Sequence, residues 1–197
     1  MSALVSIDQD IPLDGRKARS EKTRAVIVDA LMALIQGGNL KPTSEDVASH
    51  AGVGHRTVFR HFQDMDTLYQ EISIRMKARI DEEIEPPLPD GPLTRRIDVL
   101  IKSRSDIFER IKMFRRATMI QAWRSPFLRQ NRKHYDAILR RRFLVALPEV
   151  KVRPGDIQSA IEVLVSFEAW EHLRVDQGKS IAAAREAMKQ SLQLLLK

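Results

Sequence analysis

Apolar residues recur at steps of three and four positions along most of this 197-residue chain, the spacing that places them on one face of an α-helix. No stretch shows the sustained alternation of apolar and polar residues that predicts a half-buried β-strand. Glycine and proline punctuate the helical pattern. We therefore predict an all-α fold of about nine helices. The predicted helices begin at Ser20 and near Thr43 and then cover residues 55–62, 64–85, 93–110, 112–123, 126–146, 155–176 and 180–196.

The segment PPLPDGP, residues 86–92, holds four of the nine prolines. Because proline cannot continue a helix and restricts the residue before it, we expect a rigid joint here. The joint separates an N-terminal domain, residues 16–85, from a C-terminal domain, residues 86–197. Residues 1–15 show no helical period and are expected to form a flexible tail.

Residues 43–62 read TSEDVASHAGVGHRTVFRHF, which predicts a short helix, a break at AGVG and a second short helix. Two helices that meet at a corner need a small residue at their contact, a glycine in the turn and a branched anchor on the second helix. Ala48, Gly52 and Val58 meet these needs. The underside of the corner is expected to consist of Val47, Ala51, Val53, Phe59 and Phe62. The side chains left to face outward are His55, Arg56, Thr57, Arg60 and His61, a set that would also suit an ordinary solvated helical hairpin.

A longer pattern, V-A-x-x-A-G-V-x-x-x-T-V-F-x-H-F-x-D-x-D-x-L over residues 47–68, resembles the TetR family of bacterial transcription regulators. One amphipathic helix precedes it and another follows it, as in that family. The specific resemblance spans about residues 18–72. Beyond that, the chain is similar only in its number of helices and in a loose F-x-x-W-x-x-L pattern at 167–173.

The resemblance implies that the helix 55–62 enters the DNA major groove while the preceding helix lies against the backbone. Thr43 and Ser44 would then reach phosphate. The residues implied to contact DNA are Thr43, Ser44, Gly54, His55, Arg56, Thr57, Phe59, Arg60 and His61. Of these, His55, Arg56 and Arg60 would face base edges or nearby phosphates, and Thr57 and His61 would bind phosphate. A basic arm would consist of Arg16, Lys17 and Arg19.

Three positions depart from the family pattern. Gly54 replaces the usual Ser cap of the second helix, so a capping side-chain oxygen is lost, although Gly is tolerated there. Phe59 stands where Tyr is common and Met65 where Lys is common. Each departure is expected to weaken contacts that do not depend on DNA sequence, and none removes the fold.

The net charge of +7 and the pI of about 9.9 suggest a polyanionic partner, but the distribution of charge weakens that inference. Residues 1–94 hold 11 basic and 15 acidic residues, a balance of −4. Residues 95–142 hold 15 and 4, a balance of +11, and residues 143–197 hold 7 of each. The basic excess therefore lies in the C-terminal domain rather than around the predicted DNA-binding helices.

Several kinds of chemistry have little support. The chain has no cysteine, which excludes disulfides and thiolate chemistry, and no apolar run of signal-peptide or membrane-spanning length, so we expect a cytoplasmic protein. His50, His55 and His61 span a turn without any cysteine beside them, so no metal is expected. Neither a catalytic triad nor a phosphate-binding loop stands out. We expect no cofactor and no enzymatic activity.

The region 93–147 contains Phe and Met residues, a Trp and a Tyr at helical spacing, which usually indicates core packing. The family resemblance favours a small-molecule cavity there. Candidate lining residues are Phe108, Met113, Met119, Trp123, Phe127 and Tyr135. Arginines are interleaved with them, at 104, 115, 116 and 124, and no carboxylate lies among them between Glu109 and Asp136. An amphipathic anion would suit such a cavity, although a uniformly solvated basic face is the other interpretation.

These features predict a dimeric, sequence-specific DNA-binding regulator, a repressor that binds an inverted repeat and that a small molecule releases. The helices 155–176 and 180–196 carry apolar residues beyond their main stripes, such as Val163, Val165 and Leu194, and are expected to form the dimer interface. The alternative is a helical interaction or carrier protein with a degenerate helix-turn-helix.

Overall fold

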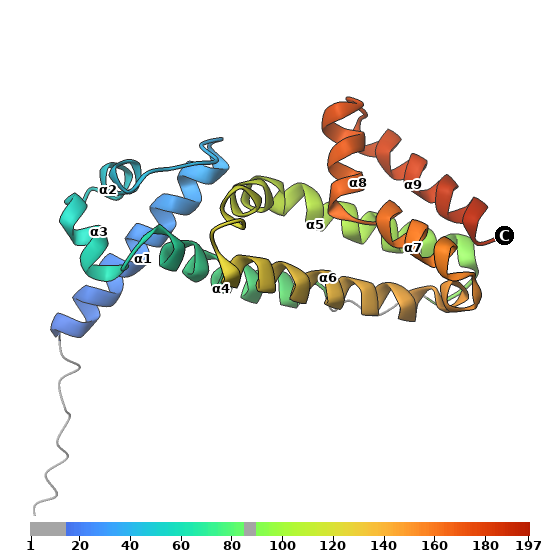
Figure 1. Cartoon of the computed structure of the whole chain (residues 1–197), viewed down its shortest axis with the longest axis horizontal. Coiled ribbons are helices and arrows are strands. Elements are labelled where there is room, and N and C mark those ends of the chain that lie inside the picture. The colour runs from blue at the N-terminus through green and yellow to red at the C-terminus, as the bar shows by residue number, and fades with distance from the viewer. Residues whose placement is uncertain (1–14, 85–89) are drawn as a thin grey trace, which may run out of the picture. The chain divides into compact units, whose positions relative to one another are not determined.

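The computed structural model describes residues 15–84 and 90–197, and in these ranges the chain is all-α (Figure 1). The predicted fold class is confirmed. The helices of the described part are α1 (Gly15–Gln36), α2 (Ser44–Ala51), α3 (His55–His61), α4 (Met65–Ile84), α5 (Leu93–Gln121), α6 (Pro126–Ala146), α7 (Gly155–Leu164), α8 (Phe167–Glu171) and α9 (Ile181–Leu195). A 3₁₀ turn at Pro148–Val152 and a π-helical turn at His172–Asp176 join the later helices.

The described residues form nine α-helices, as expected, but two predictions of helix bounds were wrong. Two predicted helices are one helix, and one predicted helix is two, so the total is unchanged. The predicted helices 93–110 and 112–123 are one continuous helix, α5, because no glycine or proline interrupts the chain at Ile111. The predicted helix 155–176 is broken instead. Ser166 caps a new helix there, because its Oγ accepts a hydrogen bond from the Ala169 N–H at 3.1 Å.

The first helix begins at Gly15, five residues before the predicted start at Ser20. Arg19 donates from Nε to the Gly15 carbonyl at 2.9 Å, which extends the helix through a segment that carries no apolar period. The expected tail therefore lies, apart from Gly15, outside the described residues. Most of the expected proline joint, residues 86–89, also lies outside them.

Two compact units make up the chain, and the division between them falls inside α4, between Leu68 and Tyr69. This division lies upstream of the proline segment at which the sequence placed the domain boundary. α4 is one uninterrupted helix across the division, so its first residues belong to the N-terminal unit and the rest to the C-terminal unit.

In the N-terminal unit α2 packs against α1, and α3 packs against α2 (Figure 1). Its core consists of fully buried aliphatic residues of α1 and the anchors of the corner: Ile27, Val28, Leu31, Ile35, Val47, Ala48, Val58 and Phe62. The start of α2 is fixed by a reciprocal cap: Thr43 Oγ accepts from the Asp46 N–H at 3.1 Å, and the Asp46 carboxylate accepts from the Thr43 N–H at 2.8 Å. The hydrogen bond that the Thr43 backbone N–H donates to the Asp46 carboxylate is the largest cause of the lowered pKa of Asp46. The cap therefore depends on an ionised carboxylate.

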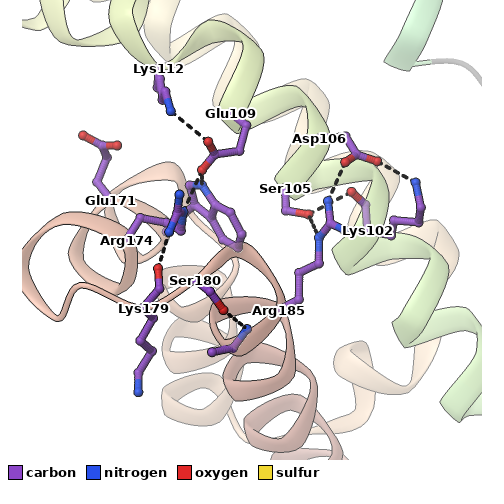
Figure 2. A network of polar contacts seen from close by, with 12 residues as sticks. Lys102, Ser105, Asp106, Glu109, Lys112, Glu171, Arg174, Lys179, Ser180 and Arg185 are labelled. Carbon is purple, nitrogen blue, oxygen red and sulfur yellow. Dashed lines mark hydrogen bonds and ion pairs between the residues drawn. The ribbon is translucent and has the colours of Figure 1, made fainter.

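The C-terminal unit has its own core, built around Trp170, Phe108 and Phe143 with apolar residues of α7 and α9. A polar network joins α5 to α8, the π turn and α9 at one side of this core (Figure 2). The Glu109 carboxylate accepts from the Trp170 indole at 3.0 Å, from Arg174 Nε at 2.9 Å and from Lys112 Nζ at 2.9 Å. Nearby, Arg185 binds Ser105 Oγ at 2.6 Å and Asp106 at 2.5 Å. The network holds the π turn and α9 in place against α5.

Within the described ranges, no helix is both long enough and apolar enough to cross a lipid bilayer.

Candidate nucleic-acid interface and effector cavity

The corner between α2 and α3 is made by backbone that only glycine adopts easily. Gly52 closes α2 with φ 65° and ψ 32°, in the left-handed region. The Val53 N–H returns to the Ala48 carbonyl at 3.0 Å, and α3 then begins after Gly54, which caps it without a side-chain hydrogen bond. The corner thus forms as the positions of Ala48, Gly52 and Val58 predict.

Four of the predicted contact residues, His55, Arg56, Phe59 and Arg60, lie on the exposed face of α3. Thr57 and His61 lie half-buried beside that face. Phe59 was wrongly expected under the corner, because its side chain is 43% exposed and packs edge-on against the His55 ring, with 4.9 Å between centroids. Arg56 and Arg60 form no ion pair with any residue that the structure describes, so both guanidinium groups are available to an anion.

A small polar cluster joins the N-termini of α2 and α3. His55 Nε2 lies 2.9 Å from Ser44 Oγ and 3.1 Å from a Glu45 carboxylate oxygen, and Ser44 Oγ donates to the other Glu45 oxygen at 3.2 Å. A hydrogen bond from its own backbone N–H is the largest cause of the lowered pKa of Glu45, with smaller contributions from Ser44 and His55. Sequence reasoning missed Glu45, although an acid in the first turn of a helix was visible.

The far end of α3 is held by Arg24 of α1, which donates to the His61 carbonyl at 2.9 Å and stacks over the Phe62 ring at 4.2 Å from its centroid. Burial, followed by the charges of Arg60 and Arg24, lowers the pKa of His61. Thr43, an expected DNA contact, is the N-cap of α2, and its hydroxyl oxygen accepts the capping hydrogen bond from the Asp46 N–H. The side chains of the expected basic arm, Arg16, Lys17 and Arg19, are exposed on the first turns of α1.

Among the described residues, no group of three or more His, Cys, Asp or Glu side chains converges as metal ligands would. His55 and His61 lie at opposite ends of α3, and His50 is on the exposed side of α2. The histidines of this region therefore do not form a joint site.

The C-terminal unit contains a cavity of about 530 Å³, lined by residues of α4 to α8 and the link between α7 and α8. Its apolar and aromatic wall consists of Met76, Ile107, Phe108, Ile111, Phe114, Leu128, Tyr135, Leu139, Phe143, Val163, Val165 and Phe167. Its polar and charged residues are Ser73, Arg104, Arg115, Thr118, Asn131, Arg132, Asp136, Arg140, Glu162, Ser166 and Glu168. Of the six predicted lining residues, Phe108 and Tyr135 are in the wall and Met113, Met119, Trp123 and Phe127 are not. Met119 and Trp123 lie at the solvent surface near the end of α5.

The stretch between Glu109 and Asp136 has no carboxylate in the sequence, but the folded cavity does contain carboxylates beside its arginines. Folding brings Asp136 of α6, Glu162 of α7 and Glu168 of α8 to the cavity. Glu168 lies 3.0 Å from Arg132 and 3.5 Å from Arg115, Asp136 lies 3.2 Å from Arg115, and Glu162 lies 2.6 Å from Arg140. The sequence could not show this because α7 and α8 are distant along the chain from α5.

The sequence profile of the bacterial regulatory proteins of the tetR family matches residues 27–72, the segment that holds the corner, the exposed face of α3 and the start of α4. This segment of the chain belongs to the tetR family of bacterial regulatory proteins. The match begins within α1 and ends at Ile72, close to the range over which the motif resembled the family.

Solved structures of TetR-family regulators are similar to this chain in fold over most of its length. A TetR-family transcriptional regulator from Streptomyces coelicolor is 16% identical over 89% of this chain and 78% of its own, with a TM-score of 0.63. A putative one from Rhodococcus sp. is 17% identical over 89% and 100%, also with a TM-score of 0.63. NalD of Pseudomonas aeruginosa, the secondary repressor of the MexAB-OprM multidrug efflux pump, is 21% identical over 89% and 95%, with a TM-score of 0.51. No curated protein matches the chain significantly.

Proposed function

We propose that this TetR-family protein binds an inverted-repeat DNA operator as a homodimer and represses transcription until a small molecule occupies its cavity. The observation that carries the proposal is the exposed face of α3, where Arg56 and Arg60 form no ion pair within the described residues and stand beside His55. Arginine on a helix that fits the major groove can bind the acceptor atoms on the edge of a guanine or the anionic phosphates. The N-terminus of α2, with Ser44, would lie against the phosphate backbone.

Selection of bound fragments from a pool of random duplexes tests this function. The expected product is an inverted repeat whose half-sites are separated by about one helical turn or a multiple of it, because two symmetric recognition helices must meet one face of the duplex. A selection that enriches no sequence over the starting pool would support the alternative, a helical carrier with a degenerate helix-turn-helix. Gly54 without a side-chain cap and Phe59 without a hydroxyl are the features that favour that alternative.

Homodimerisation is proposed through the outer face of α9 and the adjoining helices. Leu194 is 68% exposed, and Ala183 and Ala187 lie on the same side of α9 at helical spacing, so their small side chains allow a close approach of a second copy. Val163 of α7 is exposed as well, as the sequence led us to expect. Val165, however, is buried in the core of its own chain and does not belong to the surplus apolar surface.

The change Leu194→Glu is expected to convert the dimer to a monomer at micromolar concentration, because it would bury an unpaired carboxylate in the interface. Sedimentation equilibrium measures this directly. Val145→Glu is the matched control, because Val145 is exposed on α6, a helix that packs against α5 and the 3₁₀ turn. A parent protein that sediments as a monomer, or a Leu194→Glu variant that remains a dimer, would contradict the proposed interface.

Release by a ligand is proposed to act through α4. Ser73 and Met76 of this helix line the cavity, and the first residues of the same helix belong to the DNA-binding unit. A ligand that shifts α4 would therefore move the start of the helix together with its cavity-facing turns, because a helix transmits displacement along its length. Differential binding of the ligand to the two positions of α4 would supply the coupling free energy between the sites.

A further inference from the structure

We propose that the cavity takes an elongated amphipathic carboxylate, such as a fatty acid, whose head group binds Arg104. This inference rests on the effector role proposed for the cavity and names the chemical class of its ligand. Arg104 lies on α5, lines the cavity and is only 7% exposed. A charged side chain buried this deeply is costly unless a counter-charge reaches it.

The protein satisfies Arg104 only in part. Its two terminal nitrogens donate to the Val165 carbonyl at 2.6 Å and to the Leu139 carbonyl at 2.5 Å, and its guanidinium carbon lies 5.4 Å from the centre of the Phe143 ring. A guanidinium group has five N–H donors, so about three remain for another acceptor. No carboxylate of the described residues forms an ion pair with it. Both protein acceptors are neutral, so neither hydrogen-bond partner carries a negative charge.

The other charges of the cavity cancel one another. Arg115, Arg132 and Arg140 are matched in number by Asp136, Glu162 and Glu168, with which they form ion pairs. Four arginines and three carboxylates leave a balance of +1, and Arg104 is the arginine without a carboxylate. The paired groups are also more exposed, with the exception of Arg115, and so lie nearer the solvent. The cavity therefore presents one buried cation, Arg104, that is not matched by a carboxylate of the lining.

Burial lowers the pKa of Arg104 to about 10, and the charge of Asp136 opposes that shift only in part. The side chain is therefore still a cation at neutral pH. A carboxylate is the counter-ion whose planar shape matches the guanidinium fork, with two oxygens that accept in parallel. A primary ammonium head group would meet like charge at the same place, which excludes simple cationic amphiphiles from this end of the cavity.

The arrangement of the apolar lining residues indicates the shape of the hydrocarbon part of the ligand. From Arg104, lining residues follow one stripe of α5 through Phe108, Ile111 and Phe114 to Thr118. The rise along the helix axis from Arg104 to Thr118 is about 21 Å, at roughly 1.5 Å per residue. An extended hydrocarbon chain would lie along this stripe, whereas a compact ligand would leave much of the 530 Å³ unfilled.

Calorimetric titration of the full-length protein with dodecanoate, dodecan-1-ol and dodecylamine, all below their micellar concentrations, separates the head groups on one hydrocarbon chain. We expect dodecanoate to bind the parent protein more tightly than the alcohol by about tenfold or more, and the amine to bind more weakly than both. In Arg104→Met the preference for dodecanoate over the alcohol should vanish. In Arg116→Met it should persist, because Arg116 pairs with Glu171 outside the cavity.

If Arg104→Met does not fold, Arg104→Lys retains a cation without the planar fork and should reduce the preference by a smaller factor. Equal binding of the alcohol and the carboxylate by the parent protein would overturn the anion assignment while leaving an effector cavity in place. The absence of binding by all three probes, or tightest binding by the amine, would overturn it as well. None of these results depends on DNA, so a failure of the DNA selection would be recognised separately.

Discussion

Alanine at Arg60 is expected to weaken binding to the selected operator by about 1–3 kcal/mol, and alanine at both Arg56 and Arg60 by about twice that, if the two contacts are independent. The reason is that both guanidinium groups are exposed on α3 and engaged by no carboxylate in the described part of the chain. If Arg60 reads a guanine, its replacement should also relax sequence preference at that base pair. If it binds phosphate, the loss should be uniform across sequences. Gel-shift titration with operator variants distinguishes the two cases.

Lys133→Ala is the charge-matched control for these variants. Lys133 is exposed on α6 in the C-terminal unit, so its replacement changes the net charge by the same amount without touching α3. Operator affinity should remain within about twofold of the parent, because Lys133 lies outside the unit that contains α3 and its replacement acts only through the net charge, which salt screens. If Arg56→Ala and Arg60→Ala both bound the operator as the parent does, α3 would not be the recognition helix.

Alanine at Glu109 is expected to lower the free energy of unfolding by about 2–4 kcal/mol. Its carboxylate accepts from the Trp170 indole, Arg174 and Lys112, and it is largely buried. Removal leaves the indole N–H of a fully buried tryptophan without an acceptor and unties the π turn from α5. Urea denaturation followed by Trp fluorescence measures the change. Glu186→Ala, on the exposed side of α9, should change stability by less than about 0.5 kcal/mol.

The Glu109 carboxylate also makes the free energy of unfolding depend on pH. Burial opposes ionisation of Glu109, but hydrogen bonds from Lys112, Arg174 and Trp170 outweigh it and hold the pKa below its ordinary value. A carboxyl group whose pKa is lower in the folded state stabilises the protein fully above its unfolded pKa of about 4.3 and loses that contribution as pH falls through the folded value. The free energy of unfolding should therefore fall less between pH 5 and about pH 3 in Glu109→Gln than in the parent. An identical fall in both would contradict the network in Figure 2.

The N-terminal unit could be predicted closely because its determinants are local. Gly52 and Val58 specify the corner by backbone and packing demands within a few residues, and the Thr43 cap can be identified from its spacing to Asp46. Phe59 was misplaced because seven residues of helix give too few turns to fix which side chains are buried. Glu45 was missed because its role depends on His55, which the corner brings to it.

The cavity was predicted less well because its walls come from distant segments. Arg104 stood among apolar residues in the sequence, which suggested an anionic ligand, but the carboxylates that neutralise its neighbours lie on α6, α7 and α8. Ser166 ends the predicted helix 155–176 by a local cap, and that break places Val165 and Phe167 in the cavity wall. No periodicity within one helix could indicate this arrangement.

Binding of the purified protein to its selected duplex, followed by fluorescence anisotropy over a series of salt concentrations, tests the central claim most directly. We expect specific binding that weakens steeply as salt rises, because counterions are displaced from several phosphates, and a complex of two protein chains per duplex. We also expect the selected duplex to bind at least about a thousandfold more tightly than a scrambled duplex at the same salt concentration. Equal affinity for the selected and the scrambled duplex at every salt concentration would contradict it.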